Sequence, residues 1–370
     1  MELQSKREPR EALPYFLRAT ALDADFTMAW LSAASAYGTR DQRADSILQT
    51  LNVRRAQLAP LDRLLLDFEL SFDGGDRPGA LEAMHQVLEI APGSTHLWQA
   101  GALALRLNRP REAIELLTQV DPESGWMRGW VLYWTRLTRT YHELGDYEAE
   151  VEALDRMRHL HPNAPGTLAV EIRVLGAGGR IDELGPRIRE GIQRSTGRAL
   201  FLNGIPFRGF GELHAHGYPE AASSLVDSTL EWFENRTSDW RQDPGQSYVY
   251  AQLLDQAGRW DESEAILDDL VEAVPFGGPE HNNTALELAY VLANQGKRDQ
   301  AFSALGLTGR SNSLTIRAWV EAALGERERA MELLRERGRE FDMHELGLSV
   351  RFESLRDYPP FVEEFVRPQG

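Results

Sequence analysis

The sequence has no cysteine, which excludes disulfide bonds, thiolate catalysis and cysteine-ligated metal over all 370 residues. No apolar run approaches the roughly eighteen residues that a membrane-spanning helix needs, so no membrane insertion is expected. The N-terminus, MELQSKREPREAL, lacks the apolar segment of a secretory signal, and we expect a cytoplasmic location. Only Lys6 and Lys297 are lysines among 40 basic residues, an arginine bias typical of GC-rich bacterial genomes.

Positive charge is also scarce, since 40 basic residues face 57 acidic ones and the formal net charge is −17. A chain of this charge repels nucleic-acid phosphates and anionic lipids unless it carries a local basic patch. We therefore expect no nucleic acid among its partners. Apolar residues still make up 42% of the chain, enough to build a sizeable core.

A short phrase recurs along the chain: a turn residue, one or two polar residues, an acidic residue and usually an alanine. Its eight copies begin at Gly75, Asn108, Gly145, Gly179, Gly217, Gly258, Gly296 and Gly325. The steps between successive turn residues are 33, 37, 34, 38, 41, 38 and 29 residues. A near-constant period of this size is typical of arrays in which each structural repeat packs on its neighbours.

Each phrase follows an apolar-periodic stretch and itself opens a helix, which indicates helix–turn–helix units. Glycine suits the turn because it accepts the left-handed backbone that ends a helix. Small residues such as Ala113 and Ala301 follow the turn, where two helices approach closely, and Glu150 is an exception. Several second helices close at a proline, as at Pro92, Pro162 and Pro275.

This pattern resembles the tetratricopeptide repeat, whose unit of about 34 residues is a helix–turn–helix. In one unit the matching residues are Trp134, Leu137, Tyr141, Gly145, Leu154 and Pro162. In another they are Tyr250, Leu254, Gly258, Leu267 and Pro275. Two positions depart from the pattern, because Asn108 replaces a turn glycine and Ser263 replaces the usual alanine.

The resemblance implies an all-α fold, a right-handed α-α superhelix of about eight to nine units. We expect one continuous solenoid over residues 1–370, least regular at 197–245, with a C-terminal cap at 341–370. The first helices are expected at 10–22, 26–38 and 43–58. In the tail, Pro359 and Pro360 break one helix and permit a short last one.

Trp126, Trp130 and Trp134 lie four residues apart and form an aromatic stripe. Because four residues rotate a helix by only about 40° beyond a full turn, the three side chains share one face. A cofactor box and a membrane-interface belt are alternatives. We predict that the stripe is mostly core, with Trp130 and Trp126 continuing it one and two turns before Trp134.

Binding residues follow from the resemblance, which implies that fixed positions of each first helix face the concave groove. These positions are Trp98, Arg106, Thr135, Arg139, His142, Glu143, Arg173, Tyr248, Gln252, Asp255, Asn283, Tyr290 and Asn294. The set is polar and aromatic, which suits an extended peptide or a protein partner, although a solvated inner face is the alternative. We expect Arg139, Arg173 and Tyr248 to line one continuous groove. The family's clamp of lysines and asparagines is not legible, which argues against chaperone C-terminal tails as partners.

The stretch GRALFLNGIPFRGFGELHAHGY, residues 197–218, is the least regular part of the chain. Four glycines between Gly204 and Gly217, with Pro206, predict a poor helix. A possible ligand pocket there contains Phe201, Phe207, Arg208, Phe210 and His214. The alternative is a distorted repeat with tight helix contacts at its glycines.

Catalytic signals are weak. The pairs His159/His161 and His214/His216 lack a third ligand at a recognisable spacing, so we expect neither a metal nor another cofactor. The sequence contains no HExxH, GxSxG or GxxxxGK[ST] motif. We therefore predict a protein that is not an enzyme, with an unrecognised site on the acidic inner surface as a minor alternative.

Two segments, LAPLDRLLLDFELSFDGG and FESLRDYPPFVEEFVRPQG, resemble the C-terminal repeat regions of bacterial multidomain signalling proteins. In such proteins the array follows a Ser/Thr kinase, a nucleotide cyclase or a DNA-binding domain. The resemblance implies a protein-interaction scaffold within a larger regulatory protein. A ligand-sensing domain with its pocket near 197–218 is the alternative function.

The N-terminus reads as a second helix whose usual partner is missing, with Ala12, Phe16 and Ala19 at the packing positions. An uncapped array end exposes apolar side chains. We expect Leu13 or Leu17 to be largely exposed, or to meet an upstream domain or a second copy of the chain.

Overall fold

The computed structural model describes residues 9–38, 41–124, 127–194, 205–308, 313–337 and 350–366. Within these ranges the regular structure is entirely helical and contains no strand, which confirms the all-α prediction. Within each of the two units described below, the helices form antiparallel pairs that pack on their neighbours along the chain, as a helical solenoid requires. Trp126 and Phe201 lie outside the described residues.

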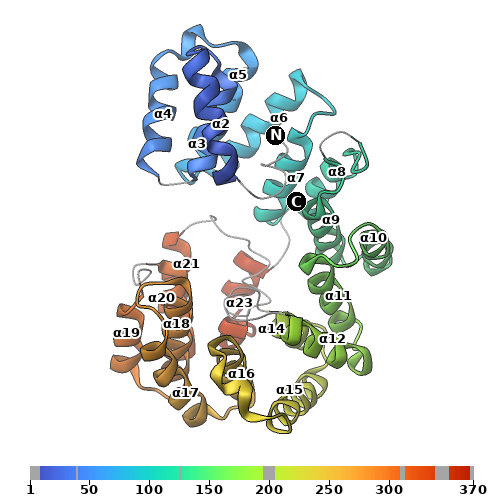
Figure 1. Cartoon of the computed structure of the whole chain (residues 1–370), viewed down its shortest axis with the longest axis vertical. Helices are drawn as coiled ribbons and strands as arrows, with labels where there is room; N and C mark the ends of the chain where they lie inside the picture. The colour runs from blue at the N-terminus through green and yellow to red at the C-terminus, as the bar shows by residue number, and fades with distance from the viewer. Residues whose placement is uncertain are drawn as a thin grey trace. The chain divides into compact units, whose positions relative to one another are not determined.

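The described residues form two compact units, which divide between Ala164 and Pro165. The first unit contains α2 (Pro9–Leu22), α3 (Thr27–Tyr37), α4 (Gln42–Val53), α5 (Pro60–Asp73), α6 (Arg77–Ile90), α7 (His96–Arg106), α8 (Pro110–Leu117), α9 (Val131–Leu144) and α10 (Tyr147–Leu160), coloured blue to green in Figure 1. A short 3-10 turn, η1 (Arg55–Gln57), follows α4.

The second unit continues the same pairing. Its helices are α11 (Pro165–Ala177), α12 (Ile181–Arg194), α14 (Ile205–Ala215), α15 (Pro219–Glu234), α16 (Pro244–Gln256), α17 (Trp260–Ala273), α18 (Pro279–Asn294), α19 (Arg298–Gly306), α20 (Leu314–Ala323) and α21 (Arg327–Arg337). Shorter turns are η3 (Ser238–Gln242), η4 (Val350–Leu355), α23 (Pro359–Phe361) and η5 (Val362–Val366). That the two units join into one continuous solenoid stays a prediction.

All eight turn residues of the repeat phrase adopt the left-handed backbone and join two helices. Their φ angles run from 59° at Asn108 to 83° at Gly217. Asn108 is the one residue other than glycine with a positive φ among the described residues, and asparagine tolerates this region better than most side chains. A ninth pair, α3 and α4, turns at Gly38 with a φ of 91°. The number of pairs therefore agrees with the predicted eight to nine units.

The fifth residue after each of the eight turns is buried against the preceding helix. These residues are Ala80, Ala113, Glu150, Leu184, Ala222, Ser263, Ala301 and Ala330. Most are small, as close helix approach requires, and the polar members need partners. The buried hydroxyl of Ser263 has such a partner, because it donates a hydrogen bond to the carbonyl oxygen of Ala251 at 2.9 Å.

Helix ends agree with the sequence at the prolines and disagree at the end of α4. α6, α10 and α17 each end two residues before the predicted proline. The helix expected at 43–58 is shorter, because α4 ends at Val53 and η1 replaces its last turn. Pro60 accounts for the extended backbone of Ala59, which separates η1 from α5.

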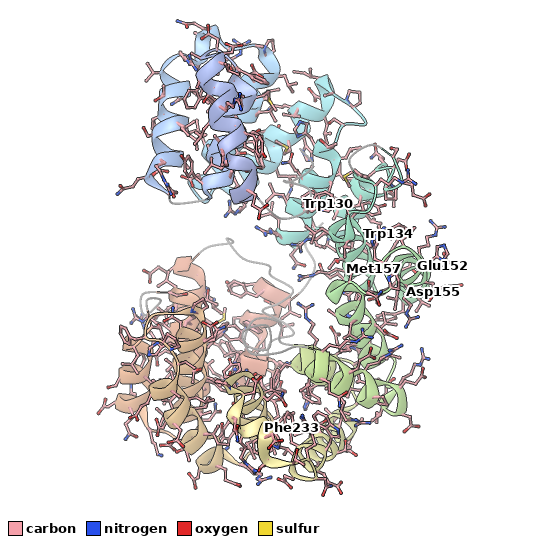
Figure 2. The ribbon with its side chains drawn as sticks, in the orientation of Figure 1. Trp130, Trp134, Glu152, Asp155, Met157 and Phe233 are labelled. Atoms are coloured by element: carbon pink, nitrogen blue, oxygen red, sulfur yellow. The ribbon has the colours of Figure 1, made fainter. Side chains whose placement is uncertain are left out.

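The tryptophan stripe is only partly helical. Trp134 lies in α9 and is buried, as predicted. Trp130 is instead the residue before α9 and has an extended backbone, so the prediction that it continues the helix by one turn is wrong. The cause is Gly129, whose φ of 82° is incompatible with a right-handed helix. Figure 2 shows Trp134 on α9 beside α10, where Met157 is fully buried and Glu152 is exposed on the outer side.

The glycine-rich stretch forms a regular helix, α14, so the expectation of a poor helix is wrong for residues 205–215. The glycines serve close packing instead. A Cβ atom at Gly176 of α11 would lie 2.8 Å from the Cβ of Glu212 and 3.0 Å from the carbonyl oxygen of Gly209. The absence of side chains at these positions lets α11 and α14 approach, which agrees with the alternative of tight helix contacts.

The N-terminal helix α2 packs on α3. Leu17 is 36% exposed and Leu13 is half-buried, so neither is fully covered within the chain.

Candidate functional site

The predicted groove residues of the first unit lie on two first helices. Trp98 and Arg106 belong to α7, and Thr135 belongs to α9; all three are half-buried. The ring centroids of Trp98 and Trp130 are 4.4 Å apart with their planes tilted by 48°. The indole N–H of Trp98 is buried and meets no acceptor among the described residues. We call Trp98, Arg106, Thr135 and Trp130 the α7–α9 face.

Arg139 and His142, also on α9, bind other side chains of their own helix pair. The Arg139 Nε donates to the Glu143 Oε1 at 2.8 Å. The His142 Nδ1 lies 2.8 Å from the Oε2 of Glu150, and both side chains are buried. His142 therefore satisfies the acidic residue that replaces the usual alanine in the repeat phrase. The pair links α9 to α10.

The expectation that Arg139, Arg173 and Tyr248 lie open to a partner is wrong. They are 8%, 5% and 6% exposed, respectively. Arg139 is held in the first unit by Glu143, whereas Tyr248 in the second is covered by side chains from α18 and the C-terminal segment. The partner-binding role of the remaining predicted residues stays a prediction.

Four side chains of the second unit meet around the carboxylate of a fifth residue, Glu287. Tyr248, Gln252 and Asp255 come from α16, and Glu287 and Tyr290 come from α18; we call them the α16–α18 cluster. The Gln252 Nε2 donates to the Glu287 Oε2 at 2.6 Å, and the Tyr248 hydroxyl donates to the same oxygen at 3.2 Å. Four of the five were predicted from the sequence as groove residues of neighbouring units.

The cluster is completed by an arginine from far along the chain. Arg351 lies in η4, and its Nη2 donates to both carboxylate oxygens of Glu287. Its guanidinium carbon also lies 4.0 Å from the centroid of the Tyr290 ring. The guanidinium is therefore held on one side by a carboxylate and on the other by an aromatic face, two contacts that suit its planar charge.

The two carboxyl groups of the cluster differ in charge. Burial, and then the negative charge of Glu287, raise the pKa of Asp255 well above its ordinary value. Burial would also raise the pKa of Glu287, but the Arg351 guanidinium and the neighbouring polar side chains hold this pKa below its usual range. Asp255 therefore holds its proton more tightly than an ordinary aspartic acid, whereas Glu287 keeps its negative charge more readily and pairs it with Arg351.

The residues around Arg351 form a C-terminal segment, residues 350–366, that packs on the second unit. Phe352 and Phe361 are fully buried, and their ring centroids are 5.5 Å apart. Phe352 also meets Trp319 of α20, with 6.4 Å between the ring centroids. The Ser354 Oγ donates to the carbonyl oxygen of Ala322 at 2.8 Å. The segment, orange-red in Figure 1, therefore binds α18 and α20 through both aromatic and polar side chains.

Two predicted groove residues have smaller parts. The Nδ2 of Asn294 donates to the carbonyl oxygen of Tyr290 at 2.9 Å, so this side chain stays on its own helix. Asn283 is half-buried near the start of α18.

The predicted ligand pocket near α14 is divided between core and surface. Phe210 is fully buried in the hydrophobic core of the second unit, and Phe207 packs against it with 5.9 Å between ring centroids. Arg208 is exposed and His214 is half-buried. Packing thus accounts for both described phenylalanines, and Phe233 of α15, labelled in Figure 2, belongs to the same core.

Sequence reasoning missed Glu287 and Arg351. A signal for Glu287 was present, because it is an isolated acid within the otherwise apolar run TALELAYVLA of α18. A carboxylate on a buried face needs a cation or a proton, and this need predicts a distant basic partner without identifying it.

Comparisons with known proteins add little to this geometry. No family model matches the chain, and no curated protein matches it. Among solved structures, a tetratricopeptide repeat protein from Parabacteroides merdae is 16% identical over 80% of this chain and 99% of that one, with a TM-score of 0.34. NprR in complex with its cognate peptide NprX is 11% identical over 84% and 96%, with a TM-score of 0.37.

Human IFIT1, as a dimer with PPP-AAAA, is 15% identical over 91% of this chain and 87% of that one, with a TM-score of 0.38. At such low scores these proteins say nothing about the site or the partner of this chain.

Among the described helices, none combines the length and the apolar character that crossing a membrane would require. The helix pairs and their turns have the architecture of a tetratricopeptide-like solenoid.

Proposed function

We propose that the chain is a non-catalytic scaffold that binds a peptide or protein partner on the faces of its first helices. The observation that carries this proposal is the α16–α18 cluster. In this cluster, residues predicted from the sequence as groove positions surround a bound polypeptide segment. That segment is the chain's own C-terminal segment. The contacts combine a charge-assisted hydrogen bond, a cation–π contact and buried aromatic rings, which are the usual means of peptide recognition.

The α7–α9 face supports the proposal in the first unit. Two tryptophans in ring contact, a half-buried arginine and an indole N–H without an acceptor among the described residues lie on neighbouring first helices. Tryptophan and arginine are enriched among residues that dominate binding energies. A partner that supplies a carboxylate would suit the half-buried Arg106 of this face.

Photo-crosslinking tests this function. A photoreactive amino acid replaces Arg106 or Thr135 on the α7–α9 face, and matched controls replace the exposed Gln86 of α6 and Glu115 of α8. We expect both face positions to crosslink the same protein in host cells and the controls to crosslink none. Crosslinks that come equally from the controls, or from them alone, would refute the assignment of this face.

The wider context is also part of the proposal. The similarity of residues 58–75 and 352–370 to repeat regions of bacterial signalling proteins favours a cytoplasmic scaffold within a larger regulatory protein. Capture of a kinase, cyclase or DNA-binding protein by the crosslinks above would support this context.

A further inference from the structure

We propose that the α16–α18 cluster is a recognition site for an arginine followed by an aromatic residue, occupied here by Arg351 and Phe352 of the chain's own C-terminal segment. A partner segment that presents the same pair displaces them. This inference rests on the proposed scaffold function and names the chemistry of one of its partners. The helical array fixes one side of this contact, and the C-terminal segment supplies the replaceable side.

The acceptor side of the contact is built by the helical array. Glu287 is 2% exposed and is positioned by the Tyr248 hydroxyl and the Gln252 amide, which belong to the neighbouring pair. Gln252 also donates to the Tyr248 hydroxyl at 3.3 Å. These bonds do not involve the C-terminal segment, so they orient the carboxylate whether or not Arg351 is bound. The Tyr290 ring is likewise fixed, because it is buried on α18 next to the carboxylate.

The chemistry of the site selects a guanidinium. Leaving the buried Glu287 carboxylate without a cation costs much free energy, so the group that replaces Arg351 must itself carry a positive charge. Lysine offers a compact ammonium without the planar surface that stacks on Tyr290. The surroundings of the next residue, Phe352, are apolar, because its ring lies against Trp319 and Phe361. An acidic or neutral peptide lacks the positive charge that the carboxylate requires.

The outer contacts of the C-terminal segment are of a weaker kind. Arg327 pairs with Asp357 at 2.9 Å and Arg335 pairs with Glu364 at 2.5 Å, and all four side chains are substantially exposed to solvent. Exposed ion pairs stabilise a structure by little. The segment is held mainly by Arg351 and its buried aromatic and aliphatic side chains, the contacts for which a partner segment would compete.

Binding of a synthetic peptide tests the proposal. The fluorescent probe has the sequence of residues 350–366, VRFESLRDYPPFVEEFV, and a matched probe has citrulline, a neutral isostere, in place of its first arginine. The full chain carrying Arg351→Ala should bind the arginine probe about tenfold or more tightly than the citrulline probe. Adding Glu287→Gln to that chain should remove the preference. Equal binding of the two probes would overturn the proposal.

Hydrogen exchange on the unaltered chain gives a second test that does not depend on the folding of a variant. An excess of the arginine peptide should speed amide exchange in residues 350–366, and the citrulline peptide should not. Unchanged exchange at saturating arginine peptide would also overturn the proposal. Photo-crosslinking from the α7–α9 face is independent of this site. If both peptide tests fail but the face positions still crosslink one protein, the scaffold function stands and only the arginine site is refuted.

Discussion

Glu69 occupies the position six residues before the turn at Gly75, where other units place Arg139, Gln252 and Tyr290. Burial, and then the negative charge of Asp73, raise the pKa of Glu69 to about 7. The side chain is half-buried on α5. Its titration is therefore a sensitive measure of how the first unit is solvated at this position.

Stability should depend on pH through Glu69. The folded pKa of about 7 exceeds the ordinary value of 4.5, so the folded state holds the proton more tightly between these limits. The contribution of protonated Glu69 to the free energy of unfolding is fully present below about pH 4.5, and it is lost as the pH rises towards 7. Glu69→Gln should remove this slope and raise the free energy of unfolding at pH 8 by on the order of 2 kcal/mol.

Urea unfolding at several pH values, followed by circular dichroism, measures this effect. Glu82→Gln on the exposed face of α6 is the control, because an exposed carboxyl should leave the slope unchanged. A Glu69→Gln chain whose stability follows pH as the parent does would show that Glu69 titrates normally.

The close approach of α11 and α14 depends on the absence of a side chain at Gly176. Gly176 faces backbone atoms of α14, and backbone cannot move aside as a side chain can. Gly178, just after α11, has only ordinary contacts, the nearest at 3.4 Å from the Val174 carbonyl oxygen. The two glycines therefore make a matched pair within one helix end.

Gly176→Ala should lower the free energy of unfolding by about 1–2 kcal/mol, because the strain of overpacking exceeds the gain in helix propensity. Gly178→Ala should change it by no more than about 0.5 kcal/mol. Chemical denaturation of both variants decides the matter. Equal stabilities would mean that the two helices separate without cost.

The elements were more predictable than their ends. Local chemistry determines a turn that needs a left-handed residue, so all eight turns could be read from glycine and from Asn108. The start of α9 could not, because Gly129 lies between two tryptophans whose spacing alone suits a helix. The helix α14 was misjudged for a related reason: tertiary packing against α11 outweighed the low helix propensity of glycine.

For the whole molecule, the net charge of −17 predicts a dependence on salt. Repulsion among like charges opposes the compact state and is screened by ions. The thermal midpoint should rise when sodium chloride increases from about 10 mM to about 150 mM, a range over which screening strengthens considerably. Differential scanning calorimetry measures the shift.

Potassium chloride at the same concentrations is the control and should give the same shift, since screening does not depend on the cation. A midpoint that falls with salt would indicate instead that the exposed ion pairs of the chain outweigh its net repulsion.

The candidate site was predictable only on one side. Helical period and repeat position selected Tyr248, Gln252, Asp255 and Tyr290, because these depend on residues near in sequence. Their charge partner could not be selected, since 64 residues separate Glu287 from Arg351 and no spacing rule links them. The burial of Arg139 and Arg173 escaped prediction for the same reason, as it follows from tertiary packing.

The same separation sets an order of events during synthesis. Arg351 is added 64 residues after Glu287, and at ordinary translation rates of about 5–20 residues per second this delay is about 3–13 seconds. During that interval α16 and α18 have been made but the carboxylate has no guanidinium. The nascent chain must keep Glu287 protonated or hydrated, so the second unit completes its core only after the C-terminal segment has left the ribosome.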